Sequence, residues 1–158
     1  MNQEQFSELV GCYIFKGMAI KEVQYLLSLF KQVTVAEGKT IFVENMPGEA
    51  LYLVQQGTVQ ISQLLAEVDE QDLTTISAGK VFGELAVIDG GTRYATARAV
   101  KNSVLLVLKR DDFDQLVREK PRLGLQLTLN IVRLFSAKMR SSKKEYRSML
   151  VASLNRNA

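Results

Sequence analysis

The sequence predicts a mainly β domain that has short helices before its strands and a long helix after them. Three observations predict this class: apolar residues at helical spacing near the N-terminus, short glycine-punctuated β-type runs in the middle, and helical texture from Asp111 onward. The 158 residues, 47% of them apolar, have the size of one domain with a buried core. We expect N-terminal helices in 1–30, a β unit in 31–110, and C-terminal helices with a basic tail in 111–158.

The first segment carries apolar residues at intervals of three and four between Glu4 and Phe30. Gly11 and Gly17 interrupt this pattern, and glycine weakens a helix interior. The segment therefore predicts two short helices with a turn near "FKGM".

After Lys31 the sequence changes to short runs typical of strands, separated by glycines at positions 38, 48, 57 and 79. "QQGT" around Gly57 predicts a tight hairpin turn, and the charged stretch "AEVDEQD" predicts an exposed hairpin tip. Seven or eight short, evenly spaced strands indicate an all-β sandwich or barrel. The runs are VTVAEG, TIFV, ALYLVQQG, TVQISQLL, DLTTIS, TARAV and SVLLVLKR.

The C-terminal segment predicts two helices. Asp111 or Asp112 can cap a helix that runs through Glu119, and "KP" at 120–121 ends it and starts another. The stretch "LGLQLTLNI" alternates as a strand does, but the following "SAKMRSSKKEYRSML" continues much better as a helix. We therefore predict one long helix over about 121–151.

Wound as a helix, this segment carries two apolar stripes. The first stripe is Leu123, Leu127, Ile131 and Leu134, and the second stripe is Leu125, Leu129, Val132 and Phe135. One stripe suffices to pack on one sheet, so the second predicts a homodimer through residues 123–139. The alternative is that N-terminal helices around Leu26 and Phe30 cover both stripes. Beyond Met139 basic residues should prevent close pairing: Lys138, Arg140, Lys143, Lys144 and Arg147.

Composition excludes several classes of function. The chain has no histidine, which removes histidine-based acid–base and nucleophilic catalysis and most zinc or iron sites. We expect no enzyme, no catalytic residue, no metal site and no cofactor. The lone Cys12 precludes an internal disulfide and suits the cytoplasm. No apolar run is long enough to span a membrane, and the N-terminus lacks the basic region of a signal peptide.

The net charge of +3 is unevenly distributed, since residues 121–158 hold eight basic residues and one acidic residue. Such a segment is either a solvated helix face that complements the acidic remainder or a contact for nucleic acid or anionic membranes. Both interpretations stay open at this point.

The most specific motif is "FGELAVIDGGTRYATARA" at 82–99, with Glu84 directly after a glycine and Arg93 nine residues later. Alanines alternate after the arginine, so Arg93, Ala95, Ala97 and Ala99 would share one face of extended chain. This combination, in the order helix–barrel–helix, resembles the cyclic-nucleotide-binding domain family. That family includes the regulatory subunits of cAMP-dependent protein kinase and the catabolite activator protein. The resemblance covers roughly residues 13–135.

The resemblance implies an eight-stranded jelly-roll barrel, or double-stranded β-helix, that binds cAMP or cGMP. It implies that Gly83 admits the ligand closely, that Glu84 accepts a hydrogen bond from the ribose 2′-hydroxyl, and that Arg93 pairs with the phosphate. In the alternative interpretation, Glu84 and Arg93 are an ordinary surface ion pair and the alanines a packed wall. The predicted ligand-binding residues are Phe82, Gly83, Glu84, Leu85, Ala86, Arg93, Tyr94 and Ala95.

Three positions depart from the family pattern. Asn45 stands where glycine is common, and asparagine tolerates a left-handed backbone. Thr92 replaces a frequent proline, and Tyr94 replaces the small residue that usually follows the arginine. The bulk of Tyr94 bears on ligand selectivity, and the resemblance favours cAMP over cGMP.

The predicted function is a regulatory sensor whose C-terminal helix moves on ligand binding and alters an unknown downstream protein. The alternative is a ligand-free domain of the same fold that acts as an interaction scaffold. A DNA-binding regulator would need a helix-turn-helix module, and we expect none in the few residues after Leu150. A cupin-like metalloenzyme would need histidine ligands.

Overall fold

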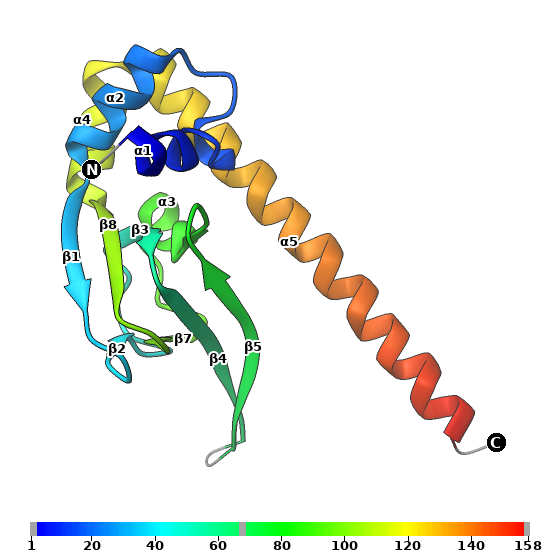
Figure 1. The fold of residues 1–158 in the computed structure, drawn as a ribbon. Coiled ribbons are helices and arrows are strands. Elements are labelled where there is room, and N and C mark those ends of the chain that lie inside the picture. The colour runs from blue at the N-terminus through cyan, green and yellow to red at the C-terminus, as the bar shows by residue number, and fades with distance from the viewer. Residues whose placement is uncertain (1–2, 67–68, 157–158) are drawn as a thin grey trace.

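The described part of the chain forms eight strands with helices packed at one end of them (Figure 1). The computed structural model describes residues 3–66 and 69–156. Its helical elements are α1 (Gln3–Val10), the 3-10 helix η1 (Tyr13–Phe15), α2 (Ile20–Leu29), α3 (Glu84–Asp89), α4 (Arg110–Glu119) and α5 (Pro121–Arg156). Its strands are β1 (Lys31–Val35), β2 (Thr40–Phe42), β3 (Ala50–Gln56), β4 (Thr58–Ala66), β5 (Asp69–Ser77), β6 (Val81–Phe82), β7 (Thr96–Ala99) and β8 (Ser103–Lys109).

The strands form two four-stranded antiparallel sheets, one in the order β1-β8-β3-β6 and the other in the order β2-β7-β4-β5. The predicted number of strands is therefore confirmed. Between the described strands the pairing gives two sheets and does not close one barrel, which corrects that part of the expectation. The protein is also mixed α and β instead of mainly β, because α5 alone holds 36 residues.

The predicted hairpin at "QQGT" is wrong. Gly57 joins β3 to β4, but these strands belong to different sheets, so Gly57 turns a corner between the sheets. Its φ is +95°, and a Cβ there would collide with the carbonyl oxygen of Asn102 and the side chain of Ser103. A corner and a hairpin turn both require glycine for its left-handed freedom, and the local sequence does not distinguish them.

The long hairpin is instead β4–β5, paired from Thr58↔Ser77 to Ala66↔Asp69. The stretch "AEVDEQD" at 66–72 is the predicted hairpin tip, and its residues 67–68 lie outside the described residues. The rest of that stretch from Asp69 onward belongs to β5.

Two clusters of buried residues make up the core. One lies between the sheets and includes Val59, Phe82, Ala97 and Leu105. The other lies where the helices pack on the end of the sheets, and its fully buried members include Leu26, Ile14, Leu51, Leu108, Leu127 and Ile131. Cys12 belongs to this second cluster, and burial raises the pKa of its thiol.

The helix α4 begins two or three residues earlier than predicted, since Lys109 and not Asp111 or Asp112 is at the N-cap position, and it has no side-chain cap. Asp111 and Asp112 lie in its first turn, where negative charge is favourable without capping. The next helix begins at Pro121, as the "KP" pattern predicts.

The helix α5 is continuous, so the strand-like alternation of its first half is a helical double stripe. The first stripe packs into the core, with Leu123, Leu127 and Ile131 buried. The second stripe faces outward: Leu125 is 60% exposed, Leu129 39% and Val132 48%. The alternative in which the N-terminal helices cover both stripes is therefore wrong within this chain.

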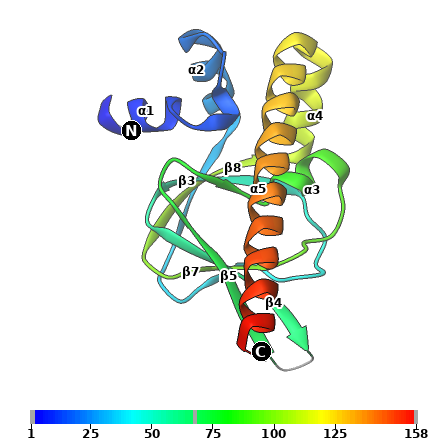
Figure 2. The ribbon, with the colours of Figure 1, turned by 90° about the vertical axis from the view of Figure 1, so that its right-hand side faces the viewer.

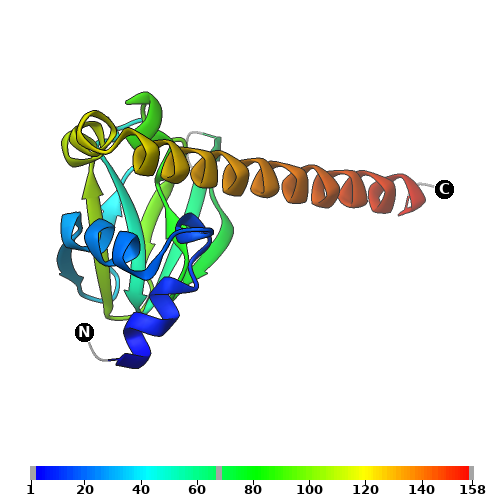
Figure 3. The ribbon, with the colours of Figure 1, turned by 90° about the horizontal axis from the view of Figure 1, so that it is seen from above.

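A buried asparagine fixes the start of α5. Asn130 Nδ2 donates hydrogen bonds of 2.9 Å to the carbonyl oxygens of Ile14 and Lys16, in and just after η1. Gln126 donates to Asn130 Oδ1 at 3.3 Å. In the view of Figure 2 α5 runs in front of the sheets, and Figure 3 shows from above that its second half projects away from them. Across the described part of the chain, no helix combines the length and apolar character that a membrane span requires.

Candidate functional site

The predicted site is built around the turn from β6 into α3. Gly83 adopts a left-handed conformation, with φ +69°, and α3 starts at the next residue. A Cβ on Gly83 would lie 2.6 Å from Arg93 Nη1, so a larger residue would strain the backbone and displace the arginine. The glycine thus lets the chain turn and brings the arginine against it.

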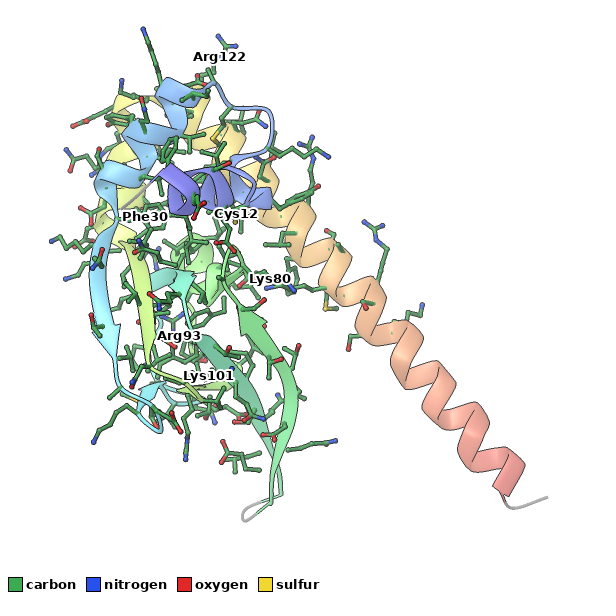
Figure 4. The ribbon with its side chains drawn as sticks, in the orientation of Figure 1. Cys12, Phe30, Lys80, Arg93, Lys101 and Arg122 are labelled. Atoms are coloured by element: carbon green, nitrogen blue, oxygen red, sulfur yellow. The ribbon has the colours of Figure 1, made fainter. Side chains whose placement is uncertain are left out.

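Arg93 is 5% exposed and lies among the strands below α3 (Figure 4). Its Nη1 donates to the carbonyl oxygen of Gly83 at 3.0 Å, and its Nη2 donates to that of Ala50 at 2.9 Å. Its third nitrogen, Nε, is buried without a hydrogen-bond partner. Burial lowers the pKa of the guanidinium, although Tyr52, Glu49 and Glu84 act in the opposite direction. The site therefore holds a fixed, desolvated positive charge with unused donor capacity.

An aromatic cluster consists of Phe42, Tyr52 and Phe82, and its Phe42 and Tyr52 rings lie against this guanidinium. The Arg93 Cζ lies 4.2 Å from the ring centre of Phe42 and 5.5 Å from that of Tyr52. Tyr52 and Phe82 stack with centroids 5.0 Å apart. Contact with aromatic faces favours a cation electrostatically and holds the planar group in one orientation.

Glu84 is 1% exposed, which is rare for a glutamate without a partner. Lys138 Nζ of α5 donates to its Oε1 at 2.6 Å, and its Oε2 is buried without a partner. Among the described side chains, ion pairs join Arg110 to Asp114 and Lys138 to Glu84. The interpretation of Glu84 and Arg93 as a surface ion pair is therefore wrong, since both are buried and each has other partners.

The remaining predicted residues lie around these two charges. Phe82, Ala86 and Ala95 are buried, while Gly83 and Leu85 are partly exposed. Ala97 and Ala99 are buried on β7, but that strand begins at Thr96, so Arg93 and Ala95 precede it and the predicted single extended face from Arg93 to Ala99 does not form. Tyr94 is half exposed. Its partial burial raises the pKa of its phenol, and the negative charge of Glu84 raises this pKa further. Tyr94 therefore lies at the edge of the site, within electrostatic reach of Glu84.

Sequence reasoning missed four residues of the site. The rings of Phe42 and Tyr52 lie on strands, where their spacing from Arg93 carries no signal. A Cβ on Gly48 would collide with Ala86 and lie 3.2 Å from Arg93 Nε, so this glycine also makes room for the arginine. The sequence pattern groups Lys138 with the basic tail, because a lysine on a helix is ordinarily solvated. Asn45 does adopt the left-handed conformation, with φ +67°, as expected.

Comparisons with known proteins agree on one family. The family described as "Cyclic nucleotide-binding domain" matches residues 32–120. The "Cyclic AMP receptor protein" of Thermus thermophilus is 36% identical over 123 residues, covering 78% of this chain and 57% of that protein. The chain spans about half the length of the curated relatives that it matches first.

Solved structures show the same fold. The Thermus thermophilus catabolite activator protein superposes with a TM-score of 0.78 at 33% identity, covering 87% of this chain and 62% of that chain. A cyclic nucleotide-binding domain from Methylobacillus flagellatus superposes with a TM-score of 0.81 at 26% identity. The match covers 90% of this chain and 82% of that chain.

Proposed function

This chain belongs to the cyclic nucleotide-binding domain family, and on that premise we propose that it is a non-enzymatic sensor of a cyclic nucleotide. The ligand binds at Glu84 and Arg93, and α5 transmits its presence to a downstream protein. A cytoplasmic location, expected from the lone Cys12, is part of this proposal.

The observation that carries the proposal is a pair of buried, unpartnered polar atoms, Glu84 Oε2 and Arg93 Nε. Leaving such atoms unpaired inside a protein is unfavourable by about 1–3 kcal/mol each. Glu84 Oε2 is a negatively charged hydrogen-bond acceptor, and Arg93 Nε is a positively charged hydrogen-bond donor. A ligand with a hydroxyl and a phosphate supplies a partner for each, as a cyclic nucleotide does.

Residues at the edge of the site determine the preference between cAMP and cGMP. The relative of Thermus thermophilus is described as a receptor of cyclic AMP, which supports cAMP. Tyr94 is half exposed beside Glu84 and is the bulkiest departure from the family pattern. We propose cAMP as the preferred ligand, with cGMP as the competitor in every assay.

Replacement of Glu84 by alanine tests the proposed role of its carboxylate. The change should weaken cAMP binding less than loss of Arg93 does, by about 0.5–3 kcal/mol for one hydrogen bond. It should also abolish the preference for cAMP over 2′-deoxy-cAMP, because the discriminating acceptor is gone. Calorimetric titration of both nucleotides into both proteins measures this. Retention of the full 2′-hydroxyl preference in the variant would show that another group reads the ribose.

The second stripe supports a further part of the proposal, a homodimer through residues 123–139. Leu125, Leu129 and Val132 expose apolar surface along one side of α5, which soluble proteins tend to cover. Two-fold pairing of this stripe with itself is the simplest cover. The side chains of Lys144 and Arg147, expected to limit the pairing, lie outside the described residues.

A ligand-free scaffold is the second candidate. Arg93 already donates to two carbonyl oxygens, and Lys138 already binds Glu84 without a nucleotide. These contacts let the domain fold with its charges largely satisfied. Titration with cAMP and cGMP separates this candidate from the sensor.

A further inference from the structure

A groove lies at the helical end of the molecule, between α2 and residues 120–123, which join α4 to α5 and begin α5. Its volume is about 390 Å³, and it is open to solvent. Its lining includes Lys21, Glu22, Tyr25, Lys120, Arg122 and Leu123. Figure 4 shows Arg122 at this end, whereas Arg93 lies among the strands. The groove shares no lining residue with the site of Glu84 and Arg93, so it is a separate feature of the surface.

Close packing between α4 and α5 fixes the shape of the groove. A Cβ on Gly124 would lie 2.9 Å from the Cα and Cγ2 of Val117, so glycine is what lets α5 approach α4 this closely. The Lys120 N–H donates to the carbonyl oxygen of Leu116 at 2.8 Å, and the Gly124 N–H donates to that of Lys120 at 2.9 Å. Leu123, which is 7% exposed, belongs to the core and forms an apolar floor. The groove is therefore preformed, and little ordering opposes binding there.

The side chains around this floor carry more positive than negative charge, since three of them are cations and one is an acid. Lys120 Nζ lies 4.3 Å from the ring centre of Tyr25, and this cation–π contact places it at the wall. Glu22 Oε2 accepts a backbone hydrogen bond of 2.8 Å at the start of α2, so its carboxylate is engaged. Lys21 and Arg122 are exposed, and neither takes part in the ion pairs found among the described side chains. The rim of the groove therefore has a net positive charge above an apolar floor.

We propose that this groove docks an acidic peptide segment of the downstream protein. An apolar side chain of the peptide enters between Tyr25 and Leu123, and carboxylates on either side of it pair with Lys21 and Arg122. The complementary charges favour encounter and fix the register of the peptide, while burial of the apolar side chain adds affinity. The inference rests on the proposed function only in naming the protein that the sensor regulates as the source of the peptide.

The form of the groove favours a peptide over other anionic partners. A membrane surface is flat, so its headgroups would meet the rim and leave the floor between the helices uncovered. A volume of about 390 Å³ lies at the small end of the range for pockets that enclose whole small molecules, and this groove is open. It suits a side chain that projects from an extended peptide. Because the groove shares no residue with the nucleotide site, we expect docking both with and without cAMP.

Selection of a random peptide library on the immobilised full chain tests the inference. We expect the recovered peptides to be enriched in aspartate and glutamate beside an apolar residue. Their binding, measured by fluorescence anisotropy, should weaken as the salt concentration rises, because the charges of the rim are exposed. The strongest-binding peptide should shift the amide NMR signals of residues 20–25 and 120–124 and leave those of β7 in place.

Reversal of the charges on the rim is the decisive variant. Lys21→Glu combined with Arg122→Glu should weaken binding of the selected peptides about tenfold or more, because two attractions become two repulsions. Both side chains are exposed, so the fold and the affinity for cAMP should not change. The matched control combines Lys39→Glu with Lys143→Glu, which alters the net charge equally at exposed positions outside the groove. This control should bind the peptides nearly as the wild type does.

Three outcomes would overturn the inference. The first is a selection without enrichment in acidic residues, or acidic peptides that the rim variant binds as well as the wild type does. The second is binding to phosphatidylserine vesicles that the rim variant loses, with no acidic peptide bound, which would make the rim a membrane contact. The third is self-association at low salt that the rim variant loses, again with no peptide bound, which would make a second copy of this chain the occupant.

The docking inference and the proposed function fail separately. If no acidic peptide binds at the groove and the wild type binds cAMP, the docking inference is wrong and the proposed function stands. If acidic peptides bind at the groove and neither cAMP nor cGMP binds the protein, the groove stands as a docking site of the ligand-free scaffold and the sensor proposal fails.

Discussion

Replacement of Arg93 by leucine should weaken binding of cAMP by about 2–5 kcal/mol, the largest effect of any single substitution in the site. Among the described residues of the site Arg93 is the buried cation, and the proposed ligand brings a phosphate whose charge would otherwise be desolvated without compensation. A guanidinium held by Gly83 and Ala50 and oriented over Phe42 needs little rearrangement to receive it. Calorimetric titration of cAMP into both proteins measures the loss.

The substitution also affects folding, because the carbonyl oxygens of Gly83 and Ala50 lose their donors. Thermal melting measures the loss of folding stability in the variant. Titration with cAMP well below the melting temperature then measures the loss of affinity in folded protein. Arg98→Leu is the matched control, since Arg98 is an exposed arginine on β7, and it should bind cAMP as the wild type does. Wild-type affinity in a folded Arg93→Leu protein would contradict the site assignment.

If the protein forms the proposed homodimer through residues 123–139, replacement of Leu129 by glutamate should convert it to a monomer. Leu129 is 39% exposed at the centre of the second stripe, and a two-fold interface buries it twice. Because each Leu129 side chain is 39% exposed before pairing, loss of both removes about 1–2 kcal/mol of apolar burial, and the two glutamates would face each other in addition. Sedimentation velocity over a range of protein concentrations, with and without cAMP, measures the change.

The matched control is Leu64→Glu, which places the same charge at an exposed leucine of β4, away from α5. It should leave the oligomeric state unchanged. A wild-type protein that is a strict monomer in both ligand states, and that Leu129→Glu does not alter, would exclude the dimer.

Much of the fold follows from local pattern. Strand runs bounded by glycine, the helix break at "KP" and the left-handed Asn45 are all local consequences of residue chemistry, and the structure has them as expected. The partner of each strand is not local. Gly57 predicts a reversal of the chain equally well for a hairpin and for a corner between sheets, and tertiary packing decides which forms.

The site was predictable in its charges but not in their environment. Glu84 and Arg93 stand out because a lone acid and an arginine flank a glycine-rich turn. Their burial, the aromatic cluster and the contact with Lys138 depend on residues distant in sequence, and a single chain carries no signal of them. Lys138 shows this most clearly, since nothing in the helix pattern separates it from its solvated neighbours Arg140 and Lys143.

The most direct test of the proposed function is calorimetric titration of the unmodified protein with cAMP and with cGMP. We expect saturable binding of at least one nucleotide with a dissociation constant in the micromolar range or below, a binding free energy of about −8 kcal/mol or stronger. A thermal shift to higher melting temperature should accompany it, because a ligand that binds the folded state stabilises it. Absence of heat and of any thermal shift at millimolar concentrations of both nucleotides would contradict the claim that Glu84 and Arg93 form a working cyclic nucleotide site.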